Sequence, residues 1–137
     1  YLDESPLFSL YTAYDQVVGK FQTALKKEEV HFVQALILTG LFFEDRPTQP
    51  SEFSKELKVG RSNISHSLRD LEKKQLIERT IHRSDARGYL IGLTKNGRRK
   101  ASRLIRLFDV TQEKLETAGG KALNTKLKEF IEAYQTG

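Results

Sequence analysis

The sequence predicts a mainly α-helical fold with one small β-hairpin. Near both ends of the chain, apolar residues recur at spacings of three and four residues, which is the period of an amphipathic helix. Two shorter helical patterns, separated by a glycine, lie between these ends. Two segments that alternate apolar and polar residues follow them, as expected of paired strands. A length of 137 residues is enough for one core, so we expect one structural domain.

The first predicted helix runs to about residue 27, where a charged run interrupts its apolar stripe. The residues of this stripe are Leu7, Tyr11, Tyr14, Val18, Phe21 and Leu25. The next predicted helix spans residues 30–43 and is apolar on nearly all sides, so we expect it to be buried. It is shorter than the roughly 20 residues that cross a bilayer. The acidic start of the chain does not resemble a signal peptide.

A short helix and a longer one come next. Thr48 is the predicted N-cap of the short helix, and Pro50 lies in its first turn, where proline is tolerated. After a tight turn, the longer helix is predicted over residues 61–75. Its core-facing residues, which fall within about 60° of one another, are Ile64, Leu68 and Leu71. Two helices joined in this way form a helix-turn-helix.

The segments 76–82 and 89–93 alternate apolar and polar residues and are predicted to form the hairpin. A hairpin directly after a helix-turn-helix is a wing, so the predicted fold class is a winged helix-turn-helix. Thr94 is the predicted N-cap of a long helix, which the pair of glycines at 119–120 separates from a last helix. The apolar stripe of that last helix is Leu123, Leu127, Phe130 and Tyr134.

Positive charge is concentrated in one part of the chain. Residues 61–106 carry 13 Lys or Arg against 4 Asp or Glu, a net charge of +9, whereas the other 91 residues carry a net charge of −4. Such a concentration is typical of proteins that bind nucleic acid. The alternative is a solvated, lysine-rich face without a partner.

The outer face of the longer helix is suited to the major groove of DNA. It has small hydroxyl groups near its start, which permit close approach, and longer cations farther along, which reach phosphates or guanine edges. An ordinary solvent face is the alternative, although a mixture of Glu and Lys would then be expected. The predicted DNA-binding residues of this helix are Arg61, Ser62, Asn63, Ser65, His66, Arg69 and Lys73.

The tip of the wing, residues 83–88, is predicted to reach the neighbouring groove. Arg87 is expected to enter the narrow minor groove, where negative potential is strongest. Asp85 is expected to hold the Arg87 side chain in an extended rotamer, and Arg83 adds a second cation to the tip. Gly88 gives the turn its backbone freedom. The alternative is an exposed surface ion pair that contributes little.

Two stretches resemble the MarR family of winged-helix regulators. "DARGYLIGLTKNG", residues 85–97, is similar to the wing signature of that family, in which Asp, a spacer, Arg, several strand residues, Leu-Thr and a nearby Gly recur. "PTQPSEFSKELKVGRSNISHSLRDLEKKQLIER", residues 47–79, is similar to its helix-turn-helix, and with the flanking helices the likeness covers almost the whole chain. Gly60 departs from the pattern, because the family commonly has a serine at the start of the recognition helix.

The resemblance implies a homodimer in which the first and last helices of both chains intertwine. Residues 1–27 would then form an N-terminal dimerisation helix, 28–94 the winged helix-turn-helix that binds DNA, and 95–137 the C-terminal dimerisation helices. The apolar stripes at both ends agree with this arrangement; the alternative is that they pack within one chain. Two recognition helices would read half-sites about 10 bp apart in a pseudo-palindrome of double-stranded DNA.

The resemblance also implies release from DNA by a small aromatic ligand. The predicted cleft residues are Tyr11, Tyr14, Phe42 and Phe43, and the alternative is that these rings belong to the core. The chain has no cysteine, which excludes thiol-based sensing. The three histidines lack ligand spacing, and no phosphate-binding loop or pair of nucleophile and base is recognisable. We therefore expect no metal, no cofactor and no enzymatic activity.

Together these features predict a cytoplasmic dimeric regulator, associated with the nucleoid when bound to DNA, that represses rather than activates transcription. Two alternatives remain open. One is an architectural protein that coats duplex DNA without sequence preference, and the other is a winged helix whose basic face binds an acidic protein. Varied polar groups on the recognition face favour the regulator over the coating protein, which needs little beyond cations.

Overall fold

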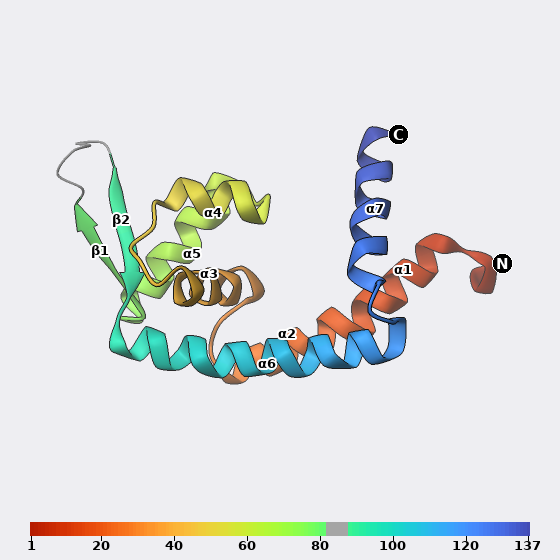
Figure 1. Ribbon diagram of the computed structural model, residues 1–137, viewed down its shortest axis with the longest axis horizontal. Helices are drawn as coiled ribbons and strands as arrows, with labels where there is room; N and C mark the ends of the chain where they lie inside the picture. The colour runs from red at the N-terminus through yellow and green to blue at the C-terminus, as the bar shows by residue number, and fades with distance from the viewer. Residues whose placement is uncertain (82–87) are drawn as a thin grey trace. The chain divides into compact units, whose positions relative to one another are not determined.

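The computed structural model describes residues 1–81 and 88–137 of the chain. These residues form two compact units, Tyr1–Ile105 and Arg106–Gly137. The mainly helical fold with one antiparallel hairpin that the sequence predicts is confirmed, and Figure 1 shows its elements. No helix among the described residues is both long enough and apolar enough to cross a membrane.

The N-terminal segment of the first unit is helical but is not one regular helix. A 3-10 turn (Leu2–Glu4) precedes α1 (Pro6–Tyr14), a π-helical turn (Asp15–Gly19) follows it, and α2 (Lys20–Lys27) completes the segment. The wider π turn interrupts the regular spacing of three and four residues. The stripe that was predicted to be continuous is therefore divided into two parts. Phe21 and Leu25 are buried, whereas Leu7, Tyr11 and Tyr14 are exposed.

Helix α3 (Phe32–Glu44) supplies the centre of the core. Its side chains Ala35, Ile37, Leu38 and Leu41 are buried, and it packs against α2, α5 and β2. The expected burial on nearly all sides is wrong for its last turn, where Phe43 is 69% exposed. The chain leaves α3 at Asp45, which adopts a left-handed conformation with φ 50°.

The helix-turn-helix consists of α4 (Pro50–Leu57) and α5 (Arg61–Lys73). Pro50 begins α4 as predicted, but the predicted N-cap, Thr48, is wrong, since Gln49 occupies that position and makes no side-chain cap. Thr48 is buried and exchanges two backbone hydrogen bonds of 2.9 Å with Ile91, so its peptide groups extend the sheet instead of starting a helix.

The connection between α4 and α5 is tight. Lys58 ends α4 with φ 54°, and Ser54 Oγ donates a 2.9 Å hydrogen bond to the carbonyl of Val59. At its other end α5 stops at Lys73, two residues earlier than predicted, and Gln75 then takes φ 60°. A residue in this left-handed conformation cannot continue a right-handed helix.

Strands β1 (Ile77–Ile81) and β2 (Tyr89–Leu93) form the hairpin. They are antiparallel, with Ile77 opposite Leu93 and Ile81 opposite Tyr89. Figure 1 shows the hairpin beside the helix-turn-helix, and β1 contacts α5 while β2 contacts α3 and α4. The base of the hairpin is buried through Ile77 and Ile91, whereas Ile81 at the far end of β1 is 77% exposed.

Helix α6 (Lys95–Gly119) begins directly at the base of the hairpin. Thr94 is its N-cap as predicted, because Gly97 N donates a 3.0 Å hydrogen bond to Thr94 Oγ1. Thr94 also donates to two carbonyls in the turn between α5 and β1, from N to Leu76 and from Oγ1 to Gln75. A β-carbon at Gly97 would lie 1.8 Å from the Leu76 carbonyl oxygen, so glycine is required at this position.

The second unit contains the C-terminal half of α6 and α7 (Leu123–Thr136). Gly120 turns the chain between these helices with φ 89°, which agrees with the predicted break at the glycine pair. The apolar side chains of α7 remain accessible, and the rings of Phe130 and Tyr134 stack with centroids 6.2 Å apart. The exposed apolar residues of this helix are Leu127, Phe130, Ile131 and Tyr134.

Candidate functional site

Helix α5 has one apolar face and one polar face, as its sequence predicts. Ile64, Leu68 and Leu71 are each at most 2% exposed and hold the helix against the core. The seven residues predicted to bind DNA all lie on the accessible side. The exposed residues of this group, called the recognition face below, are Arg61, Ser62, Asn63, Ser65, His66, Arg69 and Lys73.

The cations of the recognition face differ from their neighbours in having no acidic partner. Arg61, Arg69 and Lys73 form no ion pair with another described residue. The nearby acids are already engaged, because Asp70 pairs with Lys74 at 3.0 Å and Glu72 pairs with Arg79 at 3.1 Å. His66, Arg69 and Lys73, together with Asp70, line a shallow hollow on this surface. Positive charge on the recognition face is therefore available to an anionic partner.

The first turn of α5 lacks a side-chain cap. Gly60 is the N-cap residue, with φ −60° and ψ 148°, a conformation that any residue can adopt. Open space surrounds the position that a β-carbon would take at Gly60. Beside this turn, Arg61 and Ser65 line a second hollow with Pro50, Ser51 and Ser54 of α4.

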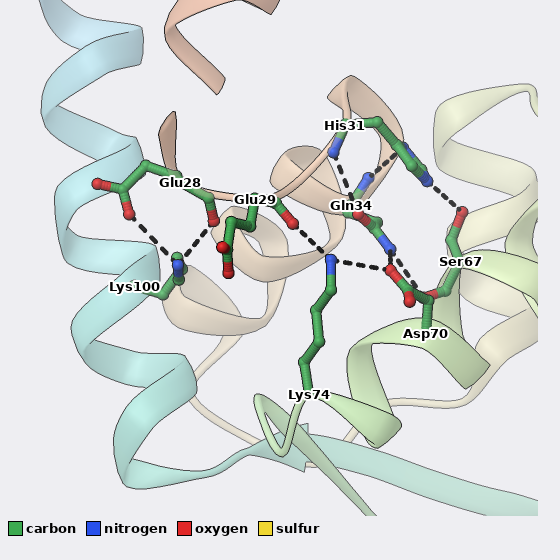
Figure 2. A network of polar contacts seen from close by, with 8 residues as sticks. All are labelled: Glu28, Glu29, His31, Gln34, Ser67, Asp70, Lys74 and Lys100. Atoms are coloured by element: carbon green, nitrogen blue, oxygen red, sulfur yellow. Dashed lines mark hydrogen bonds and ion pairs between the residues drawn. The ribbon is translucent and has the colours of Figure 1, made fainter. Parts of the chain in front are cut away.

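A buried polar network holds α5 against the start of α3, and the sequence analysis did not identify it (Figure 2). Gln34 is 1% exposed and Ser67 is fully buried. Gln34 Nε2 donates to Asp70 Oδ2 at 2.6 Å and to the Ser67 carbonyl at 3.4 Å. His31 and Gln34 also form a reciprocal cap, since Gln34 N donates to His31 Nδ1 and His31 N donates to Gln34 Oε1.

One signal in the sequence points to part of this network. A polar side chain followed three residues later by glutamine, just before an apolar run, is the pattern of a reciprocal N-cap, and residues 31–34 fit it with histidine in place of serine or threonine. Ser67 gives no comparable signal, because a hydroxyl between core positions of a helix can equally well face solvent.

The network shifts two pKa values. Partial burial is the main cause that lowers the pKa of His31; the carboxylate of Asp70 opposes this shift, and the charges of Lys74 and His66 add to it. The pKa of Asp70 is lowered as well, first by the hydrogen bond from Gln34 and then by the one from Lys74. The folded state therefore favours a neutral imidazole and an ionised carboxylate.

The predicted wing contacts Arg83, Asp85 and Arg87 lie outside the described residues. The arms of the hairpin are described, and they are joined to α5 and to each other by side chains. Arg79 pairs with Glu72 of α5, and its guanidinium lies 4.0 Å from the centre of the Tyr89 ring on β2. The base of the wing is thereby fixed next to the recognition helix.

The predicted ligand residues lie in two different settings. Phe42 is half-buried and lines a hollow of about 340 Å³ with Lys95, Arg98, Arg99 and Ser102 of α6. The Arg98 guanidinium lies 5.4 Å from the centre of its ring. Tyr11, Tyr14 and Phe43 are each more than half exposed, so none of these three is a core residue of the described chain.

Across residues 1–81 and 88–137, no three His, Asp or Glu side chains gather in a way that could hold a metal ion. His31 caps α3 and His66 lies on the recognition face, while His82 is outside the described residues.

Comparison with known proteins connects this geometry to a family. The model of the MarR family matches residues 33–89, from α3 to the start of β2, so the resemblance seen in the sequence is confirmed. Regulators of this family are DNA-binding transcription factors and not enzymes. A search of curated proteins finds no match to the chain.

Solved structures of MarR-type regulators share the fold over nearly the full length. The Staphylococcus aureus MepR–DNA complex aligns with a TM-score of 0.81 and 22% identity, covering 96% of this chain and 97% of that one. MarR from Oenococcus oeni PSU-1, described as a transcription regulator, aligns with a TM-score of 0.78 and 19% identity, covering 93% and 96%. This chain therefore shares the winged-helix fold of these structures.

Proposed function

We propose that this protein, whose residues 33–89 match the MarR family, is a dimeric transcription regulator. It would bind double-stranded DNA with sequence specificity. One observation carries the proposal. The recognition face of α5 presents three cations that have no acidic partner among the described residues, beside small polar groups, on a helix whose opposite side is buried in the core. MepR, which shares this fold, has been solved in complex with DNA.

In the proposed complex, α5 lies in the major groove. A helix of 13 residues is about 20 Å long, and the groove is wide enough to admit it. Ser62, Asn63 and Ser65 are short enough to approach base edges closely, and His66 continues this surface. Arg69, Arg61 and Lys73 reach farther, to guanine edges or to phosphates.

The wing is the second DNA contact in the proposal. Residues 83–88 would enter the adjacent minor groove through Arg87, with Asp85 directing that side chain and Arg83 close to the phosphates. The ion pair between Arg79 and Glu72 supports this assignment because it keeps the base of the hairpin next to α5.

Dimerisation supplies the second recognition helix. We assign residues 1–27 and 95–137 to the dimer contact, since exposed apolar side chains gather on α1 and on α7. A two-fold dimer reads half-sites about one helical turn apart, so the operator is a pseudo-palindrome. Repression is the proposed sign of regulation, because a dimer seated over a promoter blocks other proteins from it.

The last part of the proposal is that a small aromatic anion binds the protein and releases it from DNA. The hollow beside Phe42 supports it, because an aromatic ring and the three cations Lys95, Arg98 and Arg99 suit a planar ligand with negative charge. Titration of the DNA complex with benzoate tests this part: displacement that is lost in Arg98→Ala supports the site, and unchanged displacement in that variant contradicts it.

Selection from random duplexes is the main experiment. The expected result is an enriched pseudo-palindrome whose affinity falls linearly with salt on a log–log plot, because bound cations release counterions. Salt-dependent binding without an enriched sequence would instead favour a DNA-coating protein. Absence of duplex binding would favour a module that binds an acidic protein.

Arg69→Ala refines the same experiment. The variant should bind its duplex about 1 to 3 kcal/mol more weakly and select an altered half-site, because Arg69 is expected to contact a base edge. An unchanged selected sequence at reduced affinity would make Arg69 a phosphate contact.

A further inference from the structure

A continuous chain of hydrogen bonds runs from the start of α3 to the recognition face of α5. The backbone N–H of Gln34 donates to His31 Nδ1 over 3.3 Å. His31 Nε2 lies 3.4 Å from Ser67 Oγ, and Ser67 Oγ donates to Asn63 Oδ1 over 3.3 Å. Figure 2 shows the imidazole between Gln34 and Ser67. The chain ends at an exposed amide on the recognition face.

The first bond of this chain fixes the direction of the second, and Ser67 Oγ donates to Asn63 Oδ1 in the third. A backbone N–H can only donate, so His31 Nδ1 must be the unprotonated nitrogen of the ring. In a neutral imidazole the hydrogen is then on Nε2, which donates to Ser67 Oγ. The Ser67 hydroxyl group then donates its hydrogen to Asn63 Oδ1. This order fixes the oxygen end of the Asn63 amide toward the protein and leaves its NH₂ group as a donor toward solvent.

We propose that His31 and Ser67 are positioning residues that hold the Asn63 amide with its NH₂ group directed at the major groove. The inference rests on the proposed function, in which Asn63 contacts DNA. A donor fixed in this way selects acceptor atoms such as purine N7, guanine O6 or thymine O4 at the contacted base pair. A freely rotating amide would offer an acceptor or a donor equally well and would discriminate less.

The surroundings of the chain support a positioning role. Ser67 is fully buried, so its hydroxyl has a fixed set of partners and not a changing set of water molecules. The charged or titratable groups of α5 that face His31 are Asp70, Lys74 and His66, and Glu29 lies two residues before it. Asp70 and Lys74 are paired with each other, and Lys74 also donates to the Glu29 carbonyl.

Protonation of His31 would break the first bond of the chain. An imidazolium carries hydrogens on both nitrogens, so Nδ1 could no longer accept from Gln34 N, and the positive ring would lie at the positive end of α3. The pKa of His31 is lowered by burial, which agrees with a site that favours the neutral ring. The positioning effect is expected to be lost as pH falls through this lowered pKa, because a charged ring is unfavourable between the Gln34 N–H and Ser67.

A double-mutant cycle on DNA affinity tests the relay through Asn63. Ser67→Ala should weaken binding to the selected duplex about 3- to 10-fold in the parent protein and less than twofold in an Asn63→Ala background, since the hydroxyl acts through that amide. Equal factors in both backgrounds would overturn the proposal, because Ser67 would then act on the stability of α5. Thermal unfolding of each variant checks that it is folded.

His31→Asn provides the pH readout. Asparagine can still cap α3 but is too short to reach Ser67, and it does not titrate near neutral pH. The parent should bind about 3- to 10-fold more tightly than this variant at pH 8, and the ratio should fall toward one as pH is lowered through the folded pKa of His31. A ratio that stays constant while the ¹⁵N shifts of His31 show that its ring becomes protonated contradicts the proposal.

Nuclear magnetic resonance of the free protein separates this inference from the proposed function. The ¹⁵N shifts of His31 should identify the Nε2-protonated tautomer at pH 8, and the Asn63 side-chain amide signals should follow His31 titration in the parent but not in Ser67→Ala. The opposite tautomer, or Asn63 signals that ignore His31, would overturn the relay. Failure of the parent to bind any duplex would instead reject the proposed function and leave these signals to decide the relay.

Discussion

At the scale of single residues, the buried Gln34 amide shows how a polar group is accommodated in the core. Gln34 is almost completely buried, yet its amide nitrogen and oxygen are both hydrogen-bonded, as the high cost of an unsatisfied buried amide requires. One of its partners is Asp70, a charged residue that also pairs with Lys74. The residues that orient α5 are therefore distinct from those that it presents on its outer face.

The Asp70 carboxylate should make stability depend on pH in the acid range. Because its pKa is lowered in the folded protein, by the hydrogen bond from Gln34 above all, its contribution is present above the unfolded pKa near 3.9 and is lost as pH falls through the folded pKa. Urea unfolding of the parent and of Asp70→Asn from pH 7 to pH 2 measures this. The parent should be more stable at pH 7, and the difference should narrow below about pH 4. A difference that persists unchanged to pH 2 contradicts the assignment.

Gly60→Ser should stabilise the start of α5. The N-cap conformation is open to any residue, nothing obstructs a β-carbon, and a serine hydroxyl can accept a hydrogen bond from the first-turn N–H groups. Replacing glycine at such a site is expected to raise the free energy of unfolding by a few tenths of a kcal/mol. Gly60→Ala is the matched control, since it adds the β-carbon without the acceptor. Equal stability of the two variants would show that no cap forms.

At the scale of elements, the joint between α5, the hairpin and α6 is the most closely packed part of the site. Thr94 caps α6 and at the same time donates to carbonyls at 75 and 76, so one residue connects three elements. Gly97 lies directly over the Leu76 carbonyl. The position of the wing base relative to the recognition helix depends on this contact.

Gly97→Ala should therefore destabilise the fold, by about 1 to 3 kcal/mol or more, because its new methyl group meets a backbone oxygen that cannot rotate away. Gly92→Ala, in β2, is the matched control, since open space surrounds its β-carbon position. Chemical unfolding of both variants gives the comparison. If Gly97→Ala were as stable as the control, α6 would not pack on Leu76 as described.

The elements also divide into those that local sequence determines and those that it does not. The apolar face of α5, the Thr94 cap and the break at Gly120 were predictable, because periodicity, capping and turn preferences depend on neighbouring residues. Thr48 was assigned wrongly because its partner, Ile91, lies 43 positions away. The Gln34–Ser67 contact was missed for the same reason, and the spacing of the apolar residues gives no sign of the π turn.

At the scale of the whole molecule, the exposed apolar surface indicates that another protein chain binds there. Large apolar side chains of α1 and α7 are about half exposed or more, which is unusual for a protein that remains a monomer. A second copy of the chain is the partner that we propose for these faces. The protein must therefore be a dimer in order to bind the two half-sites of a two-fold symmetric operator.

Leu127→Asp should disturb this assembly if α7 is part of the dimer contact. Leu127 is 48% exposed, so a charged side chain costs little in a monomer but is strongly unfavourable in an apolar interface. Analytical ultracentrifugation should detect a shift from dimer to monomer, with the helical circular dichroism signal retained. A variant that sediments as a dimer like its parent would remove α7 from the interface. Lys128→Asp, at the next position of the helix, controls for added charge.

The small sheet has two edges, and each has a feature that hinders pairing with a strand from another molecule. Thr48 pairs with Ile91 and so covers the outer edge of β2 at its centre. On the other edge, β1 exposes Glu78, Arg79 and Thr80. Charged side chains along an open strand discourage a neighbouring molecule from adding a strand of its own. Growth into fibrils through this hairpin is therefore disfavoured.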